Sequence, residues 1–120
     1  MQCGGSDYQL GVSQMDTITL FRPVGEAELH LIRESGMRAF PPRLPEQPIF
    51  YPVLNEEYAR EIARNWNAKR NTPPVGYVTR FVVDAAYLSS FEVQTVGRSY
   101  QQEYWFPAAE LAYFNGHIVG

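Results

Sequence analysis

The sequence predicts an α+β fold with split, mainly antiparallel β-sheets and two to three short helices. Two observations lead to this prediction. Two segments with helical spacing occupy the first part of the chain, and several short segments rich in β-forming residues follow one another after them. Consecutive short strands favour antiparallel pairing over a doubly wound parallel sheet.

The length and composition indicate a single folded domain. The chain has 120 residues, of which 45% are hydrophobic and 19% are charged, an ordinary globular balance. We expect residues 1–15 to form a flexible polar leader and residues 16–120 to form the domain. The aromatic content of 14% is high, so some rings are expected to line a pocket as well as fill the core.

Charge and cysteine content exclude several classes of function. The net charge of −3 argues against a protein that binds nucleic acid by neutralising phosphates. Cys3 is the single cysteine, so there is no internal disulfide, and a reducing, cytoplasmic location is expected. Cysteine and histidine are too few for a structural zinc site, and no apolar run is long enough to cross a membrane.

The first elements are a strand and a helix. Residues 17–22 alternate between apolar and polar positions, which predicts a strand with Arg22 at its end, and Pro23 and Gly25 are expected to terminate it. Residues 25–35 have helical spacing with glutamates in the first turn.

A proline-rich segment separates these elements from a second strand and helix. Residues 40–48 contain four prolines, which exclude regular structure and make a stiff loop suited to a pocket wall. Residues 49–54 are then expected to form a short apolar strand. Asn55 is expected to cap a helix that packs one side, including Trp66, on the sheet.

The remaining elements are mostly short strands. Residues 76–84 are apolar on both faces, which predicts a central strand. After it we expect a helical turn at 85–90, strands at 91–96 and 99–107, a helix at 107–114 and the start of a strand at 117–120.

The strand predicted at 99–107 carries the residues of greatest chemical interest. Because side chains alternate along a strand, Gln101, Glu103 and Trp105 are expected on one face, opposite Tyr100, Tyr104 and Phe106. An ionised carboxylate among aromatic rings needs a partner. Glu103 is therefore either a solvated rim residue or a member of a polar site, and we favour the site.

Common catalytic templates are missing. The sequence contains no phosphate-binding glycine–lysine loop, no dinucleotide-binding glycine fingerprint, no nucleophile elbow and no paired-histidine metal motif. With only Cys3, His30 and His117 available, a cysteine–histidine nucleophile is not expected.

Three sparse elements, in order, resemble a known family. They are Leu20-Phe21-Arg22, then Phe50-Tyr51 followed by Tyr58-Ala59, and finally the segment from Gln101 to Pro107. In this order and in these predicted settings, the chain resembles the ADP-ribosyltransferase family, which includes bacterial mono-ADP-ribosylating toxins. The resemblance implies a split-sheet fold, NAD as substrate and a macromolecular acceptor, expected to be a protein.

The resemblance also implies roles for individual residues. Arg22 would hold an NAD phosphate or brace the nicotinamide-side ribose, and Tyr51 or Phe50 would pack on the nicotinamide. Glu103 would stabilise positive charge on the anomeric carbon, and Gln101 would orient the acceptor. An amide at position 101 is similar to family members that modify side-chain amides. The Ser-Thr-Ser element common in the family is absent, with Tyr51 as a plausible substitute.

Three alternatives stay open at this point. Arg22 and Glu103 would be a structural ion pair between neighbouring strands if there is no site. The same fold would otherwise serve as a non-catalytic module that binds a nucleotide or a protein, or as an NAD glycohydrolase in which water replaces the acceptor.

Overall fold

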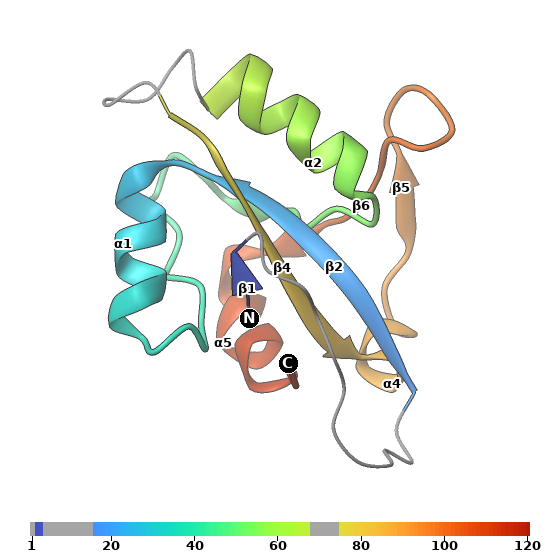
Figure 1. The fold of residues 1–120 in the computed structure, drawn as a ribbon. Coiled ribbons are helices and arrows are strands. Elements are labelled where there is room, and N and C mark those ends of the chain that lie inside the picture. Colours follow the sequence, from blue (N-terminus) through green and yellow to red (C-terminus); the bar gives the residue numbers. More distant parts are fainter. Residues whose placement is uncertain (1, 4–15, 68–74) are drawn as a thin grey trace.

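A pair of long antiparallel strands runs through the centre of the molecule (Figure 1). The computed structural model describes residues 2–3, 16–67 and 75–120. Strand β2 (Thr17–Val24) pairs with β4 (Tyr77–Asp84) over eight residue pairs, from Thr17↔Asp84 to Val24↔Tyr77. Both strands are rich in β-branched and aromatic residues, which pack well on a pleated surface.

The sheet extends on both sides of this pair. Strand β1 (Gln2–Cys3) lies on the outer side of β4, which makes β4 central as predicted. On the other side of β2, Phe21 and Val53 exchange backbone hydrogen bonds of 2.8 and 2.7 Å, and Val53 bridges in turn to Glu103. Glu103 belongs to β6 (Gln102–Tyr104), which pairs with β5 (Val93–Thr95). The bridges place Phe21, Val53 and Glu103 in one row across the sheet.

The sequence predicted that this strand would end at Pro23. Strand β2 instead continues to Val24. The row of bridges gives the reason. The N–H of Phe21 points away from β4 and toward Val53, and the nitrogen two residues further along a strand points the same way. The missing N–H of Pro23 therefore falls on the side away from β4, so it costs no hydrogen bond of the long pair.

The other elements are short. A separate two-stranded sheet pairs β3 (Ile49–Phe50) with β7 (Phe106–Pro107). The helices are α1 (Glu26–Glu34), α2 (Glu56–Ile62) with a π-helical extension η1 (Ala63–Asn67), α4 (Ala85–Leu88), the 3₁₀ turn η2 (Ala108–Glu110) and α5 (Leu111–Gly116). The predicted α+β class with antiparallel strands is confirmed, but the described residues contain four α-helices, not two to three.

Two apolar clusters lie on the two faces of the central sheet. The larger contains Leu20 and Phe81 together with residues of α1 and α5. Its buried phenylalanines pack edge to face or tilted, and they are Phe40, Phe50, Phe81, Phe106 and Phe114. Tyr104 stacks on Phe106. The smaller cluster places Tyr58 and Ala59 of α2 against Val53 and Phe21. Helix α2 thus covers one face of the sheet, and α1 and α5 cover the other (Figure 1).

The predicted start of the second helix and the predicted end of the first helix are confirmed to within a residue. The side chain of Asn55 accepts a hydrogen bond of 3.1 Å from the backbone N–H of Tyr58, which caps α2. Helix α1 ends at Glu34, and Gly36 follows with a φ of 77°, the left-handed conformation that glycine adopts at little cost.

Several predicted strands are shorter than expected. The strand at 49–54 is reduced to β3 and the bridge at Val53, because Pro52 has no N–H and interrupts the segment. The Pro52 carbonyl accepts from the N–H of Tyr104 at 3.0 Å, which is one of the two bonds of the bridge from Val53 to Glu103. The strand at 99–107 is divided between β6 and β7. At the C-terminus only Ile118 forms a bridge, to Val83.

Some predictions fall partly or wholly outside the described residues. Residues 1 and 4–15 of the expected leader lie outside the described part, whereas residues 2–3 pair with β4. Residues 68–74 of the loop expected after the second helix, and the side chain of Trp66, also lie outside the described part. None of the helices in that part is both long and apolar enough to span a membrane.

Candidate functional site

Glu103 is a buried carboxylate held by two aromatic donors. Its side chain is 7% exposed. The hydroxyl of Tyr58 donates to Oε2 at 2.8 Å, and the indole Nε1 of Trp105 donates to Oε1 at 2.6 Å. One donor comes from α2 and the other from two residues further along the chain, so both oxygens are fixed in place. The predicted shared face of Glu103 and Trp105 is confirmed by this contact.

A pocket of about 390 Å³ opens beside this carboxylate. Its walls include the rings of Tyr51 and Tyr58, the carboxylates of Glu61 and Glu103, and the amide of Asn65. The pocket thus combines aromatic surface with fixed acceptors, the usual composition of a small-molecule site. No arginine or lysine of the described residues lines it.

Two tyrosines that donate to Glu103 and Glu61 are kept protonated. Burial and the hydrogen bond to Glu103 raise the pKa of Tyr58 well above its ordinary value. Tyr100 donates its hydroxyl to Glu61, and this bond raises the pKa of Tyr100 as well. Both rings therefore act as hydrogen-bond donors to carboxylates near neutral pH.

Gln101 does not point into the pocket with Glu103, although strand alternation predicted that it would. A turn at residues 98–101 ends the alternation: the Oε1 of Gln101 accepts from the N–H of Arg98 at 2.8 Å, and its Nε2 lies 3.4 Å from Glu61. The amide lies so close to Gly97 that a Cβ there would come within 2.2 Å of its oxygen. Tyr100 likewise packs with Tyr58, not with Tyr104 on the opposite face.

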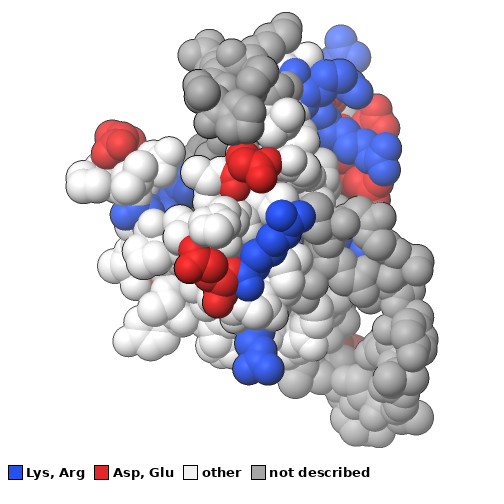
Figure 2. Space-filling model, turned by 60° about the vertical axis from the view of Figure 1, so that its left-hand side comes forward, with Lys and Arg blue, Asp and Glu red and all other residues white. Residues whose placement is uncertain are grey.

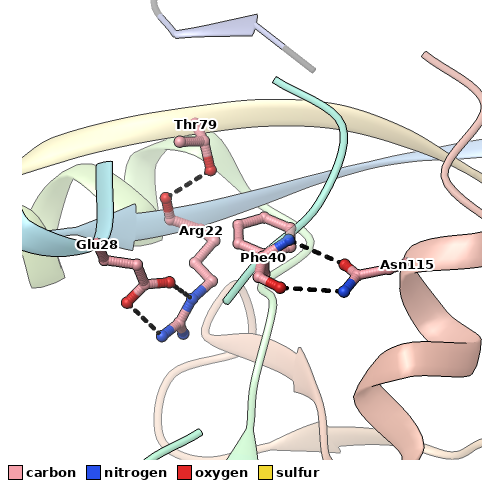
Figure 3. Close-up of polar contacts among 5 residues, drawn as sticks. All are labelled: Arg22, Glu28, Phe40, Thr79 and Asn115. Carbon is pink, nitrogen blue, oxygen red and sulfur yellow. Dashed lines mark hydrogen bonds and ion pairs between the residues drawn. The ribbon is translucent and has the colours of Figure 1, made fainter. Parts of the chain in front are cut away.

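Arg22 is buried on the other face of the sheet. It is 5% exposed, and its Nε and Nη2 donate to the two oxygens of Glu28 at 2.8 and 3.1 Å (Figure 3). Its backbone carbonyl accepts from the hydroxyl of Thr79 at 2.9 Å. Arg22 therefore forms its ion pair with Glu28, and the alternative of a structural pair with Glu103 is wrong.

Two aromatic rings lie under the Arg22 guanidinium. Its Cζ is 4.8 Å from the centre of the Phe50 ring and 5.4 Å from that of Tyr51, both within the range of cation–π attraction. Phe50 itself is 0% exposed and belongs to the core. The expectation that Phe50 packs on a ligand is therefore corrected, because its ring is covered on all sides, and Tyr51 is the ring that reaches a pocket.

A second pocket, of about 410 Å³, lies on the side of Arg22. Its walls include Arg22, Glu28, Arg43 and Gln47, and Tyr51 lines both pockets. Arg22 follows Phe21, which shares its row and its face with Glu103, so the two charged residues project from opposite faces. They line neighbouring pockets with a common wall at Tyr51, not one continuous hollow.

Three residues of the site were given no role by the sequence prediction. Tyr58 is placed by the Asn55 cap, which sets the phase of α2, and a cap three residues before a tyrosine was the available clue. Glu28 reaches Arg22 only because the chain turns from β2 into α1. Arg43 stands in the loop that the sequence predicted to be stiff and suited to a pocket wall, but nothing in the sequence distinguished Arg43 within it.

Charge is mixed on the surface. Figure 2 shows one face on which acidic and basic side chains are interspersed with uncharged ones. Within the described residues, no group of three or more His, Cys, Asp and Glu side chains is arranged to hold a metal ion.

Comparison with protein-family models, with curated proteins and with solved structures gives no match. Functional assignment therefore depends on the geometry of the two pockets and on the resemblance in Arg22, Tyr51 and Glu103.

Proposed function

We propose that this protein is a cytoplasmic mono-ADP-ribosyltransferase, which cleaves NAD and transfers ADP-ribose to a macromolecular acceptor, expected to be a protein. One observation carries the proposal. A buried carboxylate, Glu103, is fixed by Tyr58 and Trp105 at the wall of an aromatic pocket. Such a group is suited to stabilising a cationic transition state without reorganising.

The proposed reaction breaks the bond between the nicotinamide nitrogen and the anomeric carbon of the ribose. Nicotinamide leaves with the bonding electron pair, and positive charge develops on the ribose. Glu103 stabilises that charge and accepts a hydrogen bond from the ribose 2′-hydroxyl. The acceptor then supplies an electron pair to the anomeric carbon and loses its proton to solvent.

Tyr51 is proposed to pack against the nicotinamide, and Arg22 is proposed to hold the Tyr51 ring in position. The contact of the Arg22 guanidinium with the Tyr51 ring at 5.4 Å supports this assignment. The position of Tyr51 between the two pockets also supports it, because a dinucleotide bound across both would pass this ring.

The test is nicotinamide release from NAD by the Glu103→Gln variant. Glutamine keeps the size of the side chain but removes its charge, so we expect release to fall by about 100-fold or more. Glu110→Gln is the matched control, because Glu110 accepts a 2.6 Å bond from Tyr87 but lines neither pocket. Equal turnover in Glu103→Gln and the parent protein would refute the proposed mechanism.

A second candidate is NAD glycohydrolase activity. The position of Gln101 favours it, because this residue, expected to orient an acceptor, contacts Arg98 and Glu61 and does not line the Glu103 pocket. Product analysis separates the candidates: free ADP-ribose without modified protein identifies hydrolysis. Calorimetric binding of NAD without turnover would instead identify a non-catalytic binding module.

A further inference from the structure

Arg43 contains an unsatisfied donor in the interior. Its Nε is the one buried side-chain nitrogen or oxygen without a hydrogen-bond partner in the part of the chain that the structure describes. Arg43 also takes no part in the ion pairs found among those residues. A buried polar atom without a partner is rare in folded proteins and calls for an explanation, such as a functional role or a water or ion bound beside it.

The neighbours of Arg43 do not neutralise it. Glu28 is engaged by Arg22 through two hydrogen bonds, and Glu26 accepts from the hydroxyl of Tyr77 at 2.6 Å. Burial lowers the pKa of Arg43, and the nearby Arg22 cation acts in the same direction, partly opposed by Glu28 and Tyr51. In the second pocket, Arg43 is therefore the arginine that forms neither a side-chain hydrogen bond nor an ion pair with a described residue.

The same hydrogen bonds leave Arg22 with little capacity for a ligand. Its Nε and Nη2 are both directed at Glu28, and its flat side lies against Phe50 and Tyr51. Arg43 instead stands in the proline-rich loop, directly after Pro41 and Pro42 and two residues before Pro45. The fixed φ angles of these prolines reduce the entropy that the loop would lose on binding.

We propose that Arg43, and not Arg22, is the residue that binds the diphosphate of the dinucleotide substrate in the second pocket. The proposal rests on the proposed function for the identity of the ligand. Its physical basis is that a guanidinium that lines a pocket and has no carboxylate partner can donate charge-assisted hydrogen bonds to phosphate oxygens. Tyr51 lines both this pocket and the neighbouring pocket that contains Glu103, where the ribose would react.

The test compares Arg43→Gln with Arg38→Gln by calorimetry, using ADP, inorganic pyrophosphate and adenosine as probes. Arg38 is an exposed arginine near the same loop and does not line the pocket, so it is the matched control. We expect Arg43→Gln to weaken ADP and pyrophosphate binding by about 10-fold or more, and Arg38→Gln to leave both unchanged. Adenosine binding should not respond to either variant.

Thermal unfolding checks that the effect is one of recognition. Because Nε of Arg43 has no partner, Arg43→Gln should keep or raise the melting temperature without ligand, and ADP should raise it less than in the parent protein. A lower melting temperature without ligand would show a structural role and overturn the proposal.

Equal binding of ADP or pyrophosphate by Arg43→Gln and the parent would also overturn it, as would failure of the parent protein to bind either probe at millimolar concentration. These results are separate from the fate of the proposed function. Nicotinamide release that depends on Glu103 but not on Arg43 would refute only the role of Arg43, whereas Arg43-dependent pyrophosphate binding without NAD cleavage would refute only the enzymatic proposal.

Discussion

At the scale of single residues, charge in the interior is accommodated by dedicated partners. Arg22 has the two oxygens of Glu28 and two aromatic rings around its guanidinium. Glu103 has the Tyr58 hydroxyl and the Trp105 indole. Each charge is satisfied from its own face of the sheet, so the two residues need no contact with each other.

Removal of Glu28 should expose the cost of burying Arg22. In Glu28→Ala the guanidinium keeps its place but loses both carboxylate oxygens, so we expect the free energy of unfolding to fall by about 2 kcal/mol. Glu34→Ala is the comparison, because Glu34 pairs with His30 on the exposed side of the same helix. That variant should change stability by less than about 0.5 kcal/mol. Urea denaturation measures both, and equal effects would contradict a buried ion pair.

At the scale of elements, the side chain of Asn115 connects the start of the proline-rich loop to α5 by hydrogen bonds. Asn115 accepts from the backbone N–H of Phe40 at 2.9 Å and donates from its amide to the Phe40 carbonyl at 3.0 Å (Figure 3). Both groups of Phe40 are thereby paired although they belong to no strand or helix. The contact brings the start of the loop that carries Arg43 against the core aromatic cluster.

Asn115→Ala should therefore loosen this loop. Two partly buried backbone groups lose their partners, which predicts a loss of about 1–3 kcal/mol in the free energy of unfolding. Asn115→Asp keeps the acceptor but loses the donor, so it should fall between the parent and the alanine variant near neutral pH. Hydrogen exchange of the Phe40 amide should accelerate in Asn115→Ala but much less in Asn115→Asp. No change in exchange would show that the loop is held by other contacts.

At the scale of the whole molecule, one sheet separates two pockets and two apolar clusters. Helix α2 lies on the face that carries Glu103, and the main core lies on the face that carries Arg22. Tyrosines at both clusters donate to carboxylates: Tyr58 to Glu103, and Tyr87 to Glu110 at 2.6 Å. Burial and these bonds raise the pKa of both phenols.

This arrangement predicts a loss of stability at alkaline pH. Both folded-state pKa values lie above the ordinary tyrosine value of about 10, so the folded state retains protons that the unfolded chain releases. The free energy of unfolding should be insensitive to these groups below about pH 10 and should decline above it. Urea denaturation from pH 8 to 11 measures the slope, and the double variant Tyr58→Phe, Tyr87→Phe should flatten it. An unchanged slope in that variant would contradict the assignment.

Local chemistry accounts for the elements that were predicted correctly. The Asn55 cap, the glycine after α1, the prolines of the loop and the apolar run of β4 each act through neighbours in the chain, so their effects are visible in the sequence. The continuation of β2 through Pro23 was missed because it depends on which side of the strand has a partner.

The candidate site, like the fold, could be predicted from the sequence only in part. The sequence by itself determined an α+β chain with a carboxylate at position 103 beside aromatic residues, because alternation and composition are properties of short segments. Only the tertiary structure decided that Glu103 meets Tyr58 from α2, that Arg22 pairs with Glu28, that Gln101 turns away and that Arg43 keeps an unpaired donor. The physical reason is that burial and pairing depend on which distant segments pack together, and short-range spacing does not specify this.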